Sequence, residues 1–90
     1  MNKFQDIIAD NTPVLVDFFA EWCGPCKMMK PVFEELKKKM GNKIIILKID
    51  IDKNISVPTL VLWKQGEIIW RQSGALSLNE LEQILSSYIR

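Results

Sequence analysis

The sequence contains no histidine, only two cysteines and no marked excess of either charge. Without histidine, the chain lacks the usual general base near neutral pH and the commonest metal ligand of proteins. Twelve basic and eleven acidic residues give a net charge of +1. This balance offers no electrostatic basis for binding nucleic acid or an anionic membrane, so we expect neither as a partner.

Long hydrophobic runs are absent as well. No apolar stretch approaches the roughly 20 residues that span a bilayer, and the first residues show no signal-peptide pattern. Two cysteines are too few for the disulfide framework of a small secreted protein. We therefore expect a cytoplasmic, reducing location. Structural zinc takes about four Cys or His ligands, and two cysteines without histidine cannot supply them within one chain. A metal site bridged between two chains is only weakly supported. We therefore expect no metal and no cofactor.

The chain does contain enough apolar residues for one small core. Ninety residues with 48% hydrophobic content predict a single domain that covers residues 1–90. Apolar residues at positions 4, 7 and 8 predict a short helix that ends before Pro13. The segments 14–19 and 44–49 are apolar on consecutive residues, which is typical of strands buried on both faces.

Helical periodicity lies between these two strands, from about Gly24 to Met40. After a polar loop at 50–54, apolar segments at 60–63 and 68–72 flank a glycine turn and predict a hairpin. Ser77, followed by Glu80 three residues later, is a capping box before a last helix. The predicted order is helix, strand, helix, three strands and helix, which indicates an α/β fold.

Both cysteines lie in the stretch Trp22-Cys23-Gly24-Pro25-Cys26-Lys27, between the first strand and the long helix. At i and i+3 on a helix start they share one side of the first turn, within reach of a disulfide. Cys23 would face unpaired backbone N–H groups and the positive end of the helix dipole, which stabilise a thiolate. This pattern predicts a reversible dithiol in which Cys23 attacks and Cys26 resolves the mixed disulfide.

The segment Val-Asp-Phe-Phe-Ala-Glu-Trp-Cys-Gly-Pro-Cys-Lys-Met at residues 16–28 resembles the active-site segment of the thioredoxin family. The resemblance runs from about Phe4 to the C-terminus. It implies a thioredoxin-like fold, a central four-stranded mixed sheet of order 2-1-3-4 with strand 3 antiparallel, flanked by helices. It also implies a protein-disulfide reductase, a monomeric electron carrier in cell redox homeostasis. The implied partners are disulfide-containing proteins and a flavin- and NADPH-dependent thioredoxin reductase.

The resemblance extends to residues outside the cysteine pair. Asp17 matches a buried aspartate that exchanges a proton with the second cysteine, and desolvation should raise its pKa. Lys48 matches the lysine beside that aspartate. Pro58 matches a cis-proline that lies against the disulfide, and the backbone of Val57 would pair with an extended substrate segment. The substrate-docking residues implied by the resemblance are Trp22, Gly24, Pro25, Val57, Thr59 and Gly74, with Ala75 beside them. The alternative for Asp17 is a structural carboxylate that is hydrogen-bonded by the backbone or by water. The alternative for Trp22 is packing in the core.

One part of the family pattern is missing. Thioredoxins carry a further helix between the polar loop and the Val-Pro-Thr segment, whereas here Asn54 is followed directly by Ile55. The consecutive apolar residues of the first two strands nevertheless predict that both sheet faces are covered. Either one face is partly open, or residues are missing between Asn54 and Ile55. We prefer the second explanation.

Two alternative functions remain. The first is an oxidase or isomerase on the same fold in an oxidising compartment; the Gly24-Pro25 dipeptide and the missing signal argue against it. The second is a redox-inactive interaction module whose disulfide is structural. The joint presence of Cys23, Cys26, Asp17 and Pro58 argues against that alternative.

Overall fold

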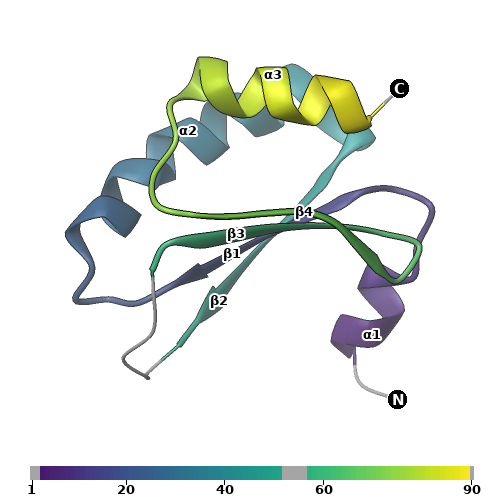
Figure 1. The fold of residues 1–90 in the computed structure, drawn as a ribbon, viewed down its shortest axis with the longest axis horizontal. Helices are drawn as coiled ribbons and strands as arrows, with labels where there is room; N and C mark the ends of the chain where they lie inside the picture. Colours follow the sequence, from purple (N-terminus) through teal and green to yellow (C-terminus); the bar gives the residue numbers. More distant parts are fainter. Residues whose placement is uncertain (1–2, 52–56, 90) are drawn as a thin grey trace.

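The computed structural model describes residues 3–51 and 57–89. One sheet carries two helices on one face and a short helix on the other (Figure 1). The strands are β1 (Val14–Phe19), β2 (Ile45–Asp50), β3 (Thr59–Lys64) and β4 (Glu67–Ser73). The helices are α1 (Lys3–Ile8), α2 (Gly24–Met40), the single 3₁₀ turn η1 (Gly41–Lys43) and α3 (Leu78–Tyr88).

The sheet has the order β2-β1-β3-β4, which confirms the predicted topology. Strand β1 pairs parallel with β2 and antiparallel with β3, and β3 pairs antiparallel with β4. Parallel strands need a long crossover, and α2 supplies it between β1 and β2. The register sets Asp17 of β1 opposite Lys48 of β2 on one side and Leu60 of β3 on the other.

Alternate residues of the strands contribute to two separate apolar cores. Leu15 packs in the core under α2 and α3, whereas its neighbours Val14 and Val16 pack in the smaller core under α1. All three side chains are fully buried. The consecutive apolar residues of β1 are therefore explained, because each face of the strand has a core of its own.

The face of the sheet that carries α1 is covered only in part. Helix α1 lies at one end of it, where Phe4 packs edge to face on Trp63 with ring centroids 5.8 Å apart. Farther along β1, Phe18 is half-buried and lines a hollow of about 480 Å³. Among the described residues this face is thus partly open, which agrees with the first of the two explanations considered, not with the preferred one. The junction of Asn54 and Ile55, on which the other explanation depends, lies outside the described residues.

The ends of the elements differ slightly from the predicted ones. Strand β2 is shifted by one residue, and β3 and β4 each extend one residue further at both ends. The turn between β3 and β4 has positive φ at both Gln65 (52°) and Gly66 (84°), as a tight hairpin turn requires. The 3₁₀ turn η1 was not predicted. The predicted polar loop at 50–54 lies outside the described residues from position 52 onward.

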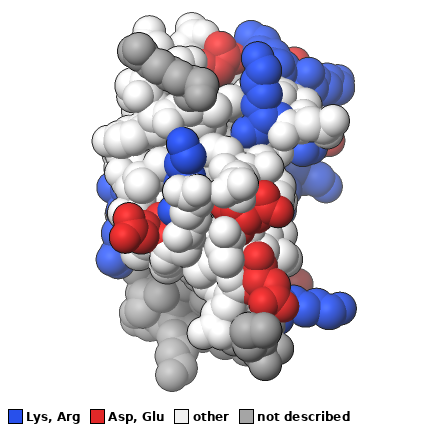
Figure 2. All heavy atoms as spheres, turned by 90° about the vertical axis from the view of Figure 1, so that its right-hand side faces the viewer, with Lys and Arg blue, Asp and Glu red and all other residues white. Residues whose placement is uncertain are grey.

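Basic side chains gather where α2 ends, at the upper right of Figure 2. The lysines of this last turn are Lys37, Lys38 and Lys39. Lys37 Nζ donates to the carbonyls of Gly41 and Ile44, each at 2.9 Å. Lys39 forms an ion pair of 2.9 Å with Glu82 of α3. The cluster therefore stabilises the carbonyl end of the helix and its contact with α3.

The capping box of α3 is confirmed. Ser77 Oγ accepts from the Glu80 N–H at 3.2 Å, and Glu80 Oε1 accepts from the Ser77 N–H at 3.1 Å. Ser77→Ala is expected to lower the free energy of unfolding by about 1 kcal/mol, because the N–H of Glu80 loses its acceptor. Urea denaturation measures the change. The matched control Ser86→Ala alters an exposed serine inside α3, and an equal loss there would contradict the cap as the cause.

No helix among residues 3–51 and 57–89 is long and apolar enough to cross a membrane.

Candidate active site

The two cysteines lie at the start of α2 and are joined by a disulfide. Cys23 is the N-cap residue, and its Sγ accepts a hydrogen bond from the Cys26 N–H at 3.1 Å. Their Cα atoms are 5.3 Å apart, and both residues are buried. Pro25 occupies the first turn, where a missing N–H removes no helix hydrogen bond. The predicted disulfide and its place at the helix N-terminus are confirmed.

Asp17 lies in the middle of β1 and is only 2% exposed. Its Oδ1 has no hydrogen-bond partner among the described residues. Burial raises the pKa of Asp17 from 3.8 to about 6, and the positive charge of Lys48 opposes part of that rise. This is the direction that desolvation of a buried carboxylate favours.

Asp17 and Cys26 line the same hollow, which we call the dithiol hollow, with a volume of about 520 Å³. It lies on the side of α2 that faces β1 and β2. Its remaining lining residues are Phe19, Ala20, Glu21, Lys27, Lys30 and Lys48. The structure thus brings the second cysteine, the buried carboxylate and Lys48 to one cavity, as the family resemblance implied.

Lys48 lies opposite Asp17 in the sheet register, as the resemblance implied. Its Nζ lies 5.7 Å from the centroid of the Phe33 ring, a cation–π arrangement. Within the described part of the chain it forms no ion pair with Asp17. It therefore acts on the carboxylate through its charge at a distance.

The bond between Val57 and Pro58 is cis, as predicted. Val57 packs against the small apolar cluster of Ala20, Cys23 and Cys26. The Pro58 carbonyl accepts from the Gly74 N–H at 2.8 Å, which joins the start of β3 to the end of β4. Gly74 has φ 99°, a conformation that disfavours a side chain. Of the predicted docking residues, Val57 thus lies against the cysteine cluster, and Gly74 is hydrogen-bonded to the proline that follows Val57.

The other predicted docking residues are distributed unevenly. Trp22 is 62% exposed beside the cysteines, which excludes core packing as its role. Gly24 and Pro25 are exposed in the first turn of α2. Thr59 is buried, and its hydroxyl lies 3.3 Å from that of Ser73 in β4. The side chain of Thr59 therefore lies in the hollow on the open face of the sheet and is not exposed beside the cysteines.

The sequence reasoning missed Lys27 and Lys30, which add two cations to the dithiol hollow. The spacing could have identified Lys30, because a residue four positions after Cys26 lies on the same helix face. It also missed Arg71 and Phe18, which line the hollow on the open face. The alternation of β1 was the only available signal for Phe18.

The residues that the structure describes contain no group of three or more His, Cys, Asp or Glu side chains able to hold a metal ion.

A family model described as Thioredoxin matches residues 1–87. The chain is similar to the thioredoxin of Buchnera aphidicola subsp. Baizongia pistaciae, with 39% identity over 95 residues that cover 96% of this chain and 87% of the relative. It is similar to the thioredoxin of Bacillus subtilis (strain 168), with 41% identity over 85 residues, 84% of this chain and 82% of the relative.

The chain is also similar to part of a longer protein, the bifunctional thioredoxin reductase/thioredoxin of Mycobacterium leprae (strain TN). The identity is 39% over 95 residues, which cover 96% of this chain but only 21% of that protein. Each of these alignments extends over 95 positions, which is more than the 90 residues of the chain. The relatives therefore contain positions that have no counterpart here.

Proposed function

The chain belongs to the thioredoxin family, and on this premise we propose that Cys23 is the attacking sulfur of its dithiol. The protein is a thiol-disulfide oxidoreductase with protein-disulfide reductase activity. The observation that carries the role of Cys23 is its position as N-cap of α2, with the Cys26 N–H directed at its Sγ. An N–H donor and the helix dipole stabilise a thiolate at that sulfur, and the thiolate is the nucleophile.

The first step begins from the reduced dithiol. The Cys23 thiolate attacks one sulfur of a substrate disulfide, and a mixed disulfide forms between Cys23 and the substrate. The other substrate sulfur leaves as a thiolate, which takes a proton from solvent.

The second step uses Cys26 and Asp17. The Asp17 carboxylate accepts the proton of the Cys26 thiol, and the Cys26 thiolate attacks Cys23 Sγ. The Cys23–Cys26 disulfide forms, and the second substrate sulfur leaves as a thiolate. Asp17 releases its proton to solvent, and the leaving thiolate takes a proton from solvent. Overall, one substrate disulfide becomes two thiols and the two protein thiols become a disulfide. The shared dithiol hollow and the raised pKa of Asp17 support this role.

Substrate docking is proposed for the surface beside the disulfide. The backbone of Val57, packed against the cysteine cluster, would pair with an extended segment of the substrate. Gly24, Pro25 and Gly74 leave room for that segment, because none of them carries a bulky side chain. Trp22, 62% exposed, supplies the apolar contact at the edge. Pro58 fixes the direction of the chain between Val57 and β3.

The wider setting is also a proposal. We propose that residues 1–90 act as one monomeric domain in the cytoplasm and reduce disulfides of partner proteins. Its own disulfide would be reduced by a flavin- and NADPH-dependent thioredoxin reductase. The relative in Mycobacterium leprae, whose name combines the two proteins, supports a reductase as the electron donor.

The test is reduction of insulin driven by dithiothreitol, compared with another thioredoxin at equal concentration. The protein is expected to accelerate the precipitation of the insulin B chain, and Cys23→Ser is expected to remove the acceleration. A wild-type rate equal to that of dithiothreitol alone would overturn the proposed function.

A further inference from the structure

We propose that the open face of the sheet holds a binding site for a small amphipathic carboxylate, such as a medium-chain fatty acid. The site is the hollow of about 480 Å³ beyond α1, which we call the open-face hollow. It is separate from the dithiol hollow, with which it shares no lining residue. Its volume lies within the range of about 300 to 1,000 Å³ that is common for small-molecule sites.

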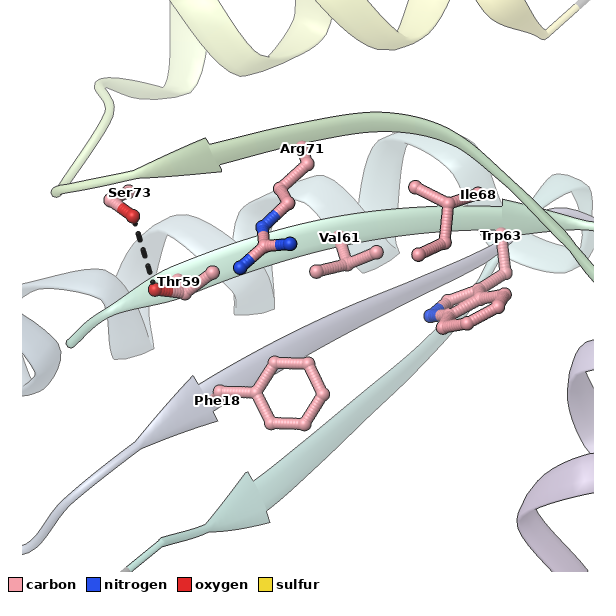
Figure 3. Close-up of a pocket in the computed structure, with 7 residues that line it drawn as sticks. All are labelled: Phe18, Thr59, Val61, Trp63, Ile68, Arg71 and Ser73. Carbon is pink, nitrogen blue, oxygen red and sulfur yellow. Dashed lines mark hydrogen bonds between the residues drawn. The ribbon is translucent and has the colours of Figure 1, made fainter. Parts of the chain in front are cut away.

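Most of the lining is apolar. Phe18 forms part of the floor, and Val61, Trp63 and Ile68 continue it along β3 and β4 (Figure 3). Ile68 is 50% exposed and Phe18 is half-buried, whereas Val61 is buried, so the described residues leave part of this apolar surface in contact with water. An apolar ligand body would remove that surface from water, which is favourable in proportion to the area covered.

The polar lining residues provide the argument for an anion. Arg71 extends from β4 across β3, and its guanidinium lies over the hollow in Figure 3. Among the described residues, no carboxylate forms an ion pair with it. The hydroxyls of Thr59 and Ser73 lie 3.3 Å apart at the same end. A guanidinium above an apolar floor suits a carboxylate, which accepts two of its N–H groups at once.

The polar and apolar groups are separated along the strands. The register pairs Thr59 with Ser73, then Val61 with Arg71, and then Trp63 with Ile68. The hollow thus changes from polar at the Thr59 end to apolar at the Trp63 end, over about 13 Å at the rise of a strand. A ligand with one carboxylate and an apolar tail matches this gradient, with its head at Arg71 and its tail directed toward α1.

Trp63 provides the reporter for a binding test. Its indole ring lines the hollow, and its buried N–H has no acceptor among the described residues. The indole N–H signal in a proton–nitrogen NMR spectrum, assigned with Trp63→Phe, will respond to a ligand at this end. The probes are octanoate and its neutral counterpart octanol. Octanoate is expected to shift the signal in a saturable manner. It is also expected to bind about tenfold more tightly than octanol, because a hydrogen bond between its carboxylate and Arg71 involves charged groups and is stronger than one between neutral groups.

Two variants separate the charge from the apolar floor. Arg71→Met keeps an unbranched side chain at an exposed position, and is expected to weaken octanoate about tenfold while octanol binds as before. The matched control Lys43→Met removes an exposed cation of η1 and should leave octanoate binding unchanged. Ile68→Glu adds a negative charge to the floor at a half-exposed position, and is expected to abolish binding of both probes.

Three results would overturn the proposal. The first is the absence of a saturable Trp63 response to octanoate. The second is equal affinity for octanoate and octanol, and the third is an equal effect of Arg71→Met and Lys43→Met. The Cys23→Ser variant should bind octanoate like the wild type, so the outcome is independent of the dithiol chemistry.

Discussion

Cys26→Ser is expected to stop multiple turnover and to leave substrate proteins covalently attached to Cys23. The second cysteine lies next to the first, with Cα atoms 5.3 Å apart, so it attacks the mixed disulfide within one molecule. Such attack has an effective molarity of about 10⁵ M or more, and the loss of rate should reach at least about a thousandfold when only external thiols remain. Insulin reduction measures the rate, and intact mass under non-reducing conditions measures the trapped complex.

Cys23→Ser is the matched control for this experiment. It removes the sulfur at the helix N-cap and should abolish turnover without accumulation of a mixed disulfide, because Cys26 lies inside α2 and lacks the N-cap position that stabilises a thiolate at Cys23. Equal trapping by the two variants would contradict the assignment of attacking and resolving sulfurs. Trapping by Cys23→Ser alone would reverse it.

Asp17→Asn is expected to stabilise the oxidised protein by about 3 kcal/mol at pH 7, since each unit of pKa rise on folding costs about 1.4 kcal/mol once the group is ionised. Burial raises the pKa of Asp17 from 3.8 to about 6. The folded protein therefore holds the proton more tightly than the unfolded chain does. Its stability falls as pH increases between these two values and stays lower above them. Asparagine cannot ionise, so this decrease should disappear.

Denaturation by guanidinium chloride between pH 4 and pH 8 measures the effect. Asp6→Asn, at an exposed carboxylate of α1, is the control and should keep the wild-type dependence on pH. A wild-type protein whose stability does not fall over this interval would contradict a raised pKa at Asp17.

The same variant tests the proton transfer. Asp17→Asn is expected to slow insulin turnover above neutral pH although the protein is more stable, because Cys26 loses its base. Single-turnover kinetics should show an unchanged first step and a slower resolution of the mixed disulfide. Unchanged turnover would leave Asp17 as a structural residue only.

Much of the fold could be predicted because its strongest local signals agree with the tertiary packing. The predicted bounds of β1 and α2 match the structure, and the capping box of Ser77 and Glu80 is formed as the sequence indicates. The bounds of β2, β3 and β4 were less accurate by a residue, since strand ends depend on pairing partners distant in the sequence. Turn η1 has no strong local signal of its own and was missed.

Local patterns likewise predicted the site only where its residues are close together in the sequence. Cys23 and Cys26 are three positions apart at the start of α2, so their spacing alone predicts a disulfide. Asp17 and Lys48 are distant in sequence, and only the resemblance to a family brought them together before the structure did. The position of Lys48 over Phe33, and the two additional lysines of the dithiol hollow, follow from how α2 packs on the sheet. No local pattern predicts those contacts.

The sequence by itself determined the dithiol, the helix that follows it and the succession of helices and strands along the chain, because these depend on residues within a few positions of one another. The order of the strands within the sheet joins distant segments, and before the structure only the family resemblance implied it. Only the tertiary structure decided how far each face of the sheet is covered. Coverage depends on which helix lies over which strands, and α1 is too short to extend over Phe18 and Val61. The open-face hollow, with Arg71 above it, is the result of that packing.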